Sequence, residues 1–302
     1  MKYIIGIDIG GTVIKYALFS TNGMVCNNSS IPTKKVATEI VDDLVKVIKE
    51  YQKENDILGI GISVPGTIDE NGTIIFGGAI KDFYNYPLRK ILEEKTSLPC
   101  VIENDANCFA LAEKWLGNAT DLTDYLCVTF GTGVGGALVL NNRLYRGAYQ
   151  SAGEIGLMLI KTCNEEQDPI HSSFNFYGSV PYGLMRLYSV YANKTAENGI
   201  EVYSLKDSQD EAAIKAVKEY VDSIAVGLLN ASVILNPQAI LIGGSISNNP
   251  SFIKDLQDAF LNLWKRHSHV SFRTPTKIIP CGLTSLSGSY GAAYKLKCSL
   301  LE

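Results

Sequence analysis

Apolar residues near the start of the chain fall in two short runs on either side of a glycine turn. The run at 4–9 is rich in isoleucine, the turn is Gly10-Gly11-Thr12, and apolar and polar residues alternate over 13–19. This pattern predicts two β-strands joined by a tight hairpin. It recurs at 125–140, where an apolar run stops at the glycines of 131–136 and then resumes. The likeness of the two hairpins indicates an internal duplication.

The rest of the chain alternates between strand and helix patterns. Buried strands are predicted at 59–64, 100–103, 239–242 and 277–280, and helices at 37–54, 87–95, 107–116, 211–235 and 287–296. Strands interleaved with helices are typical of an α/β fold. Ligands of such folds bind beyond the carboxyl ends of the strands, so polar residues and glycines that follow strands are the first candidates for a site.

The turn at Gly10-Gly11-Thr12 has the chemistry of a phosphate site. Glycines let the backbone approach a ligand, and N–H groups around the bend, with the Thr12 hydroxyl beside them, can surround an anion. Asp8 precedes the turn at the end of a buried strand, where it can hold a hydrated magnesium ion. Taken alone, the motif is equally compatible with an ordinary hairpin that carries a surface aspartate. A P-loop or dinucleotide fingerprint does not fit, because a strand follows the glycines where those motifs need a helix.

Composition limits the class of protein. The chain has 302 residues, enough for two domains, and its 46% hydrophobic and 19% charged residues describe a globular protein. A net charge of −4 disfavours nonspecific binding to nucleic acid. We recognise neither a membrane span nor a signal peptide, which predicts no membrane partner and a cytoplasmic location. The seven cysteines are widely spaced without a C-x-x-C pair, so they predict neither a disulfide framework nor a zinc knuckle.

Five motifs, in this order, resemble those of the ROK family of sugar kinases and repressors within the actin-like ATPase superfamily. They are Asp8-Ile-Gly-Gly-Thr12, Glu103-Asn-Asp-Ala-Asn107, Phe130-Gly-Thr-Gly-Val-Gly-Gly136, Gly153-Glu-Ile-Gly156 and Ile242-Gly-Gly-Ser245. The resemblance covers essentially the whole chain. It implies an α/β, two-domain actin-like ATPase (ribonuclease H-like) fold with a cleft between the domains. On this analogy residues 1–110 and 285–302 form the smaller domain, and residues 111–284 form the larger one.

The resemblance also implies ATP and Mg²⁺ as cofactors. The two glycine hairpins would contact the triphosphate, the third glycine turn would border the adenosine, and Asp8 would bind Mg²⁺ through water. The implied nucleotide-binding residues are Asp8, Gly10, Gly11, Thr12, Lys15, Gly131, Thr132, Gly133, Gly135, Gly243 and Gly244.

A second set of residues matches positions that serve the sugar in the family. Asp105 matches the catalytic carboxylate, which accepts a proton from the sugar 6-hydroxyl as that oxygen attacks the γ-phosphorus. An aspartate at this place could alternatively cap a helix. The implied substrate-binding residues are Gly66, Asn104, Glu154 and Asn175.

The chain departs from the family pattern at positions that touch or support the sugar. Leu157 stands where many members have a histidine, and Asn175 where the family has a glutamate near C1 of the sugar. The zinc-binding cysteine run is replaced by Thr162-Cys-Asn-Glu-Glu-Gln, and Asn-Leu-x-Gly-Trp is replaced by Ala79-Ile-Lys-Asp-Phe83. We therefore expect no structural zinc. The loop around Thr162–Gln167, which we call the substrate loop, would be held by a partner subunit or by packing of Phe174, Phe176 and Tyr177.

These features predict an ATP-dependent kinase that transfers the γ-phosphate to the 6-hydroxyl of a hexose or hexoside. Leu157 and Asn175 replace an imidazole and a carboxylate that would otherwise bind hydroxyls near C1 and C2, so a free anomeric hydroxyl loses polar partners. Leu157, Phe174 and Phe176 are close in sequence and would let the pocket extend past C1 to receive an apolar or sugar aglycone. Both points favour a β-glucoside. A glucokinase, an N-acetylmannosamine kinase and a noncatalytic sugar-responsive regulator are the alternatives. The family's repressors carry a helix-turn-helix domain before the first hairpin, whereas here we expect the first strand within a few residues of Met1. The expected partner is a small sugar, and a homodimer is compatible with the family.

Overall fold

The computed structural model of the chain describes residues 1–283 and 285–301. They form two compact units, which we call unit 1 (Met1–Asp121, Arg146–Ala152 and Gly282–Glu302) and unit 2 (Leu122–Tyr145 and Gly153–Cys281). The boundary expected at residue 110 is wrong, because it would cut a helix that belongs to unit 1 as a whole. The other expected domain ends, residues 284 and 302, lie outside the described residues.

Unit 1 is built on a five-stranded sheet with the order β3-β2-β1-β4-β7. Its strands are β1 (Lys2–Ile9), β2 (Val13–Ser20), β3 (Val25–Pro32), β4 (Asp56–Val64) and β7 (Cys100–Asn104), with a separate small pair, β5 (Thr67–Ile68) and β6 (Ile74–Phe76). Its helices are α1 (Ala37–Glu54), α2 (Leu88–Thr96), α3 (Asp105–Leu116) and α9 (Ser287–Ser299). β1 pairs with β2 antiparallel, as the hairpin pattern predicts, and the structure also pairs β1 with β4 in parallel.

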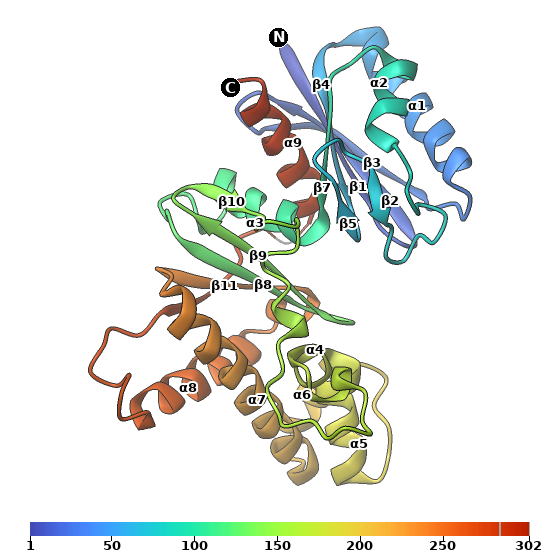
Figure 1. Cartoon of the computed structure of the whole chain (residues 1–302). Coiled ribbons are helices and arrows are strands. Elements are labelled where there is room, and N and C mark those ends of the chain that lie inside the picture. Colours follow the sequence, from blue (N-terminus) through green and yellow to red (C-terminus); the bar gives the residue numbers. More distant parts are fainter. Residues whose placement is uncertain (284, 302) are drawn as a thin grey trace. The chain divides into compact units, whose positions relative to one another are not determined.

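The two faces of this sheet bury alternate residues of β1. Ile5 and Ile7 belong to a core shared with α1 and α2, whereas Ile4 belongs to a cluster with Ala293 and Leu296 of α9. Strand side chains alternate between faces, so Asp8 lies on the same face as Ile4, the face that α9 covers. Figure 1 shows α1 and α2 together on one side of the sheet and α9 on the other.

Unit 2 repeats the plan of the first sheet, with the strand order β10-β9-β8-β11-β12. Its strands are β8 (Tyr125–Phe130), β9 (Val134–Leu140), β10 (Arg143–Tyr145), β11 (Ala239–Gly243) and β12 (Lys277–Pro280). In both sheets the central strand has an antiparallel hairpin partner on one side and two parallel strands on the other. The duplication suggested by the two glycine hairpins therefore extends to the whole sheet.

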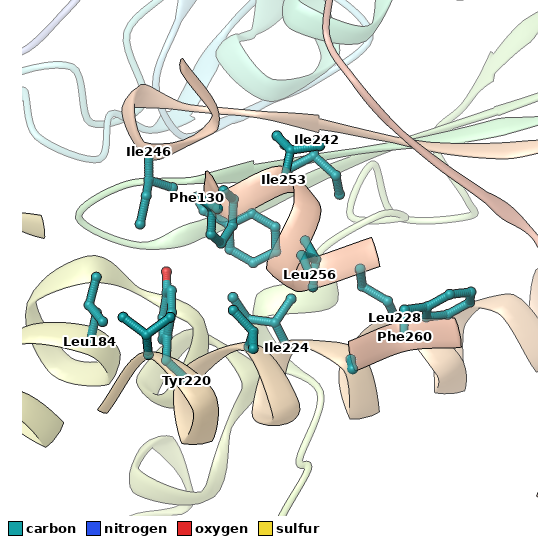
Figure 2. Packing of buried hydrophobic residues seen from close by; sticks show 14 of the residues in the cluster. Phe130, Leu184, Tyr220, Ile224, Leu228, Ile242, Ile246, Ile253, Leu256 and Phe260 are labelled. Atoms are coloured by element: carbon teal, nitrogen blue, oxygen red, sulfur yellow. The ribbon is translucent and has the colours of Figure 1, made fainter. Parts of the chain in front are cut away.

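The helical part of unit 2 includes several elements that the sequence pattern missed. Its helices are α4 (Phe174–Gly178), α5 (Arg186–Ala192), α6 (Gly199–Asp207), α7 (Glu211–Leu235) and α8 (Pro250–Arg266), with short helices η1 (Ile155–Leu157), η2 (Pro169–Ser172), η3 (Val180–Met185) and η4 (Ser245–Asn248). Figure 2 shows how α7, α8 and the sheet contribute to one core, in which Ile224 and Leu228 of α7 and Leu256 of α8 are fully buried. None of the helices in the described ranges is long and apolar enough to cross a membrane.

Candidate functional site

Asp8 lies near the end of β1, between Lys15 of β2 and Ser63 of β4. The Ser63 hydroxyl donates a hydrogen bond to Asp8 Oδ1 at 2.7 Å. Burial raises the pKa of Asp8, and the Ser63 hydrogen bond and the Lys15 charge oppose that rise. A single carboxylate suits Mg²⁺, which usually keeps several waters and binds one or two carboxylates together with phosphate oxygens. Ser63 was not predicted, although its place at the end of a buried strand is the signal that identified Asp8.

The turn that follows Asp8 is held in place by its own bonds and by Thr33. The Gly10 N–H donates to the Val13 carbonyl oxygen at 3.1 Å, and Thr33 donates to the carbonyl oxygens of Thr12 at 2.9 Å and Gly10 at 2.7 Å. Among the described residues, the N–H groups of Gly11 and Thr12 have no acceptor. These two exposed residues can therefore offer backbone donors to an anion, as their sequence predicts.

Asn104 and Asp105 lie where β7 ends and α3 begins. The N-cap of α3 is Asn104, whose Oδ1 accepts hydrogen bonds from the N–H groups of Ala106 at 2.9 Å and Asn107 at 3.2 Å. The alternative of Asp105 as helix cap is therefore wrong: Asp105 is the first helical residue and is exposed. Gly66 belongs to the same group, because its carbonyl oxygen accepts a hydrogen bond from Asn104 Nδ2 at 2.9 Å.

Glu103 fixes this strand end from the buried side. It is 4% exposed and accepts hydrogen bonds from Lys295 Nζ at 2.6 Å, from Arg146, and from the Asn104 N–H and Asn107 Nδ2, both at 3.0 Å. Burial opposes its charge, but Lys295 and Arg146 outweigh that effect and hold the pKa of Glu103 below its ordinary value. Glu103 entered the sequence prediction only as part of a motif. Its charged partners, Arg146 and Lys295, come from distant chain segments and carried no signal.

In unit 2 the second glycine turn lies beside the third. Gly131, Thr132 and Gly133 connect β8 to β9, and Gly243 at the end of β11 pairs in parallel with Thr129 of β8. Gly244 follows directly, so the ends of two adjacent strands bring the predicted residues of both turns together. Gly135, predicted as part of the turn, lies within β9.

A pocket of about 430 Å³ lies in unit 2 at these strand ends. Its lining includes Gly131 and Thr132 of the second glycine turn and Ser245 and Ile246, which follow β11. The remaining lining residues, which the sequence analysis missed, are Val180, Pro181, Met185, Glu197, Asn198, Gly199, Ile200, Asn248, Asn249 and Pro250. Asn198 and Asn249 are the N-caps of α6 and α8, a local signal that marks helix starts but no ligand site.

Glu154 and Asn175, the predicted sugar ligands of unit 2, have different surroundings. Glu154 is exposed, no described residue binds its carboxylate, and partial desolvation raises its pKa. The Asn175 Oδ1, in contrast, accepts a hydrogen bond from the Val134 N–H at 2.8 Å. Leu157 is 64% exposed, so it is available to contact a ligand, whereas Phe174 is fully buried. The expectation that Phe174 lines the sugar pocket is therefore wrong, because its ring packs in the core.

The substrate loop is held by backbone hydrogen bonds and aromatic contacts. Met158 accepts a bond from the Phe174 N–H at 2.7 Å, and Ser172 accepts one from Ile160 at 3.0 Å. Phe176 stacks on Tyr182 with ring centroids 5.9 Å apart. Over residues 1–283 and 285–301, no group of three or more His, Cys, Asp or Glu side chains is placed to hold a metal ion. The absence of structural zinc stays a prediction.

Asp82, in the segment 79–83 that departs from the family pattern, has a clear structural role. Asp82, which stands at the glycine position of the family's Asn-Leu-x-Gly-Trp, accepts a hydrogen bond from the Ala37 N–H at 2.6 Å. The N-cap residue of α1, Val36, offers no side-chain acceptor, so Asp82 supplies this bond from elsewhere in the chain.

The sequence model of the ROK family matches residues 4–297. The chain belongs to the ROK family. It is 36% identical to the β-glucoside kinase of Listeria monocytogenes over 258 residues, which are 84% of this chain and 86% of that protein. Its fold is that of solved ROK structures. A ROK family protein from Streptococcus pneumoniae in complex with sucrose is 28% identical, with a TM-score of 0.87 over 99% of both chains. A glucokinase from Streptomyces griseus in complex with glucose and AMPPNP is 25% identical, with a TM-score of 0.77 over 96% of this chain and 98% of that one.

Proposed function

We propose that this ROK family member is an ATP-dependent sugar kinase that transfers the γ-phosphate to the 6-hydroxyl of a hexose or hexoside. The observation that carries the proposal is the placement of Asp105. It is an exposed carboxylate at the start of α3, beside Asn104, and buried Glu103 binds the Asn104 backbone. A general base needs this combination of access and a fixed backbone. The β-glucoside kinase and glucokinase relatives support the same class of reaction.

In this proposal Asp105 accepts the proton of the 6-hydroxyl while that oxygen attacks the γ-phosphorus. Asn104 has one amide hydrogen that neither Gly66 nor the helix cap uses, and it donates that hydrogen to the sugar. Glu154 accepts hydrogen bonds from ring hydroxyls. Phosphoryl transfer depends mainly on alignment and charge neutralisation, so one weak base is sufficient.

We assign the pocket of unit 2 to the adenosine of ATP, because Gly131 and Thr132 of the second glycine turn line it and its surface is largely apolar. The free N–H groups of this turn, and those of Gly11 and Thr12 in unit 1, bind phosphate oxygens. Lys15 adds a positive charge near the turn of unit 1. Asp8 would hold Mg²⁺ through water, and the ion would neutralise charge on the phosphate oxygens.

For the sugar we propose a β-glucoside such as cellobiose. The Asn175 oxygen is already bonded to Val134, and Leu157 presents an exposed apolar side chain. Leu157 supplies no polar partner for a free anomeric hydroxyl and can contact an aglycone, and Asn175 offers no carboxylate acceptor for that hydroxyl. The relationship to a β-glucoside kinase supports this choice. Glucose and N-acetylmannosamine are the second candidates.

The test is to incubate the protein with ATP, Mg²⁺ and cellobiose, and to determine the phosphorylated position by NMR spectroscopy. We expect ADP release that depends on the sugar, and a product with phosphate on a 6-hydroxyl. Phosphate at another hydroxyl would refute the assigned position. ADP release that does not depend on any sugar would refute the kinase itself.

A further inference from the structure

We infer that Asn175 positions the 131–133 turn for phosphate binding and does not bind the sugar. This inference rests on the proposed function, because it assigns the turn to the phosphates of ATP. It replaces the role that the sequence resemblance implies for this position, where the family has a glutamate near C1 of the sugar. The decisive contact is the hydrogen bond from the N–H of Val134, the residue that follows the turn, to the side chain of Asn175.

The segment that begins with Asn175 binds both ends of the turn. The Val134 N–H donates to Asn175 Oδ1 at 2.8 Å, and the Val180 N–H donates to the Gly131 carbonyl oxygen at 2.8 Å. Within the turn, the Gly131 N–H donates to the Gly133 carbonyl oxygen at 3.0 Å. Of the N–H groups at 131–134, only those of Thr132 and Gly133 lack an acceptor among the described residues. The clamp therefore leaves two adjacent donors for an anion.

Asn175 leaves no room for a side chain at position 133. A Cβ atom on Gly133 would lie 2.8 Å from Asn175 Oδ1, closer than such atoms approach in real structures. The amide oxygen thus occupies the space beside the turn that a side chain at 133 would need. The bond from Val134 takes one lone pair of this oxygen, and a side chain that turned away from the turn toward another ligand would leave the Val134 N–H without its partner.

The helix that carries Asn175 is itself firmly held. Phe174 is fully buried, with its ring centroid 5.9 Å from that of Phe130. The Ser173 hydroxyl accepts the Phe176 N–H at 3.2 Å, and the Tyr220 hydroxyl donates to the Gly178 carbonyl oxygen at 2.8 Å. Because α4 is fixed at both ends and an asparagine side chain is short, the position of the amide oxygen is set by the core.

The neutrality of the amide also suits this position. A carboxylate at the same place would accept the Val134 N–H equally well, but it would add a negative charge near the turn. An asparagine supplies the acceptor without that repulsion. This explains why an amide is compatible with a phosphate-binding turn here.

The test measures three ligands separately by calorimetry: AMPPNP with Mg²⁺, adenosine, and methyl β-glucoside. Asn175→Ala removes the acceptor, and we expect the affinity for AMPPNP to fall about fivefold to tenfold, the worth of one net hydrogen bond. Affinities for adenosine and for the sugar should stay within about twofold of wild type, because neither ligand reaches the turn with a phosphate. Asn262→Ala, at an exposed asparagine of α8 in the same unit, is the matched control and should change none of the three.

Each other outcome overturns the inference. Weakened sugar binding with normal AMPPNP binding would make Asn175 a sugar ligand. An equal loss for all three ligands would make it a purely structural residue. If Asn175→Ala does not fold, Asn175→Leu, which fills a similar volume, undergoes the same titrations. A wild-type protein that binds neither AMPPNP nor methyl β-glucoside would count against the proposed function itself, an outcome distinct from a failure of the variant.

Discussion

The side-chain amide of Asn104 joins two strand ends of unit 1: Nδ2 donates to the Gly66 carbonyl oxygen at 2.9 Å, while Oδ1 caps α3. Gly66 follows β4 and Asn104 ends β7, and these strands are paired in parallel up to Val64 and Asn104. One side chain therefore fixes the backbone on both sides of the proposed sugar site.

Asn104→Ser separates the two roles of this residue. Serine keeps the N-cap but is too short to reach Gly66, so the free energy of unfolding should fall by only about 1 kcal/mol. The KM for the sugar should rise about tenfold, because both amide donors are lost. Denaturant unfolding and steady-state kinetics measure the two effects. An unchanged KM would show that Asn104 does not contact the sugar.

Asp105→Asn should remove the base and leave binding intact. We expect kcat to fall by at least about 100-fold, the low end for loss of a general base. Nucleotide and sugar affinities should stay within several-fold of wild type. Stability should change little, because Asn104 remains the N-cap of α3 and an amide oxygen at 105 can still accept the Ala106 N–H that Asp105 Oδ1 accepts at 2.8 Å. A variant with near-normal turnover would disprove the catalytic assignment.

Asp8→Asn should weaken the response to Mg²⁺ and should stabilise the folded protein. Burial raises the pKa of Asp8 above 3.8, so the ionised carboxylate costs folding free energy at pH 7, and a neutral amide avoids that cost. The variant should unfold at an equal or higher temperature than wild type at pH 7, and the difference should shrink as the pH falls toward 3.8. Half-maximal activity should need roughly tenfold more Mg²⁺.

Gly288→Ala offers a second test, since its methyl group would overlap the Asp8 carboxylate. An unaltered Mg²⁺ response in both variants would argue against Asp8 as the metal residue.

Glu103→Gln should destabilise unit 1 strongly. It leaves Lys295 and Arg146 without their buried counter-charge, which typically costs about 3–5 kcal/mol. Because the pKa of Glu103 lies below 4.5, its contribution is fully present above pH 4.5 and is lost as the pH falls through the folded-state pKa. The difference from wild type should therefore be larger at pH 7 than at pH 4. The double variant Glu103→Gln/Lys295→Met should recover part of the loss. A difference that grows on acidification would contradict this account.

Sequence patterns were sufficient for the parts of the fold that repeat regularly. The glycine turn after Asp8, the strand before Asn104 and the long helix α7 all have strong periodic or turn signals, and the structure has them where expected. The region 174–207 was missed because its helices are short and include a π-helix at Val180–Met185, which has no simple apolar period.

The surroundings of the site residues were less predictable than the residues themselves. Glu103 depends on Lys295, and Asn175 depends on Val134, and neither partner is near in sequence. Motif spacing identified which residues to consider but not which atoms were already engaged. For Asn175 that difference changes the proposed role from sugar ligand to support of the turn.

The most direct test of the account is a coupled ADP-release assay with glucose, methyl β-glucoside, cellobiose and N-acetylmannosamine, comparing kcat/KM for each. We predict release that depends on the sugar, with both glucosides at least as good as glucose. If glucose exceeds both glucosides by more than about tenfold, roughly 1.4 kcal/mol of transition-state discrimination, the proposed β-glucoside specificity is wrong. If no sugar stimulates ADP release, the protein is not the sugar kinase that we propose.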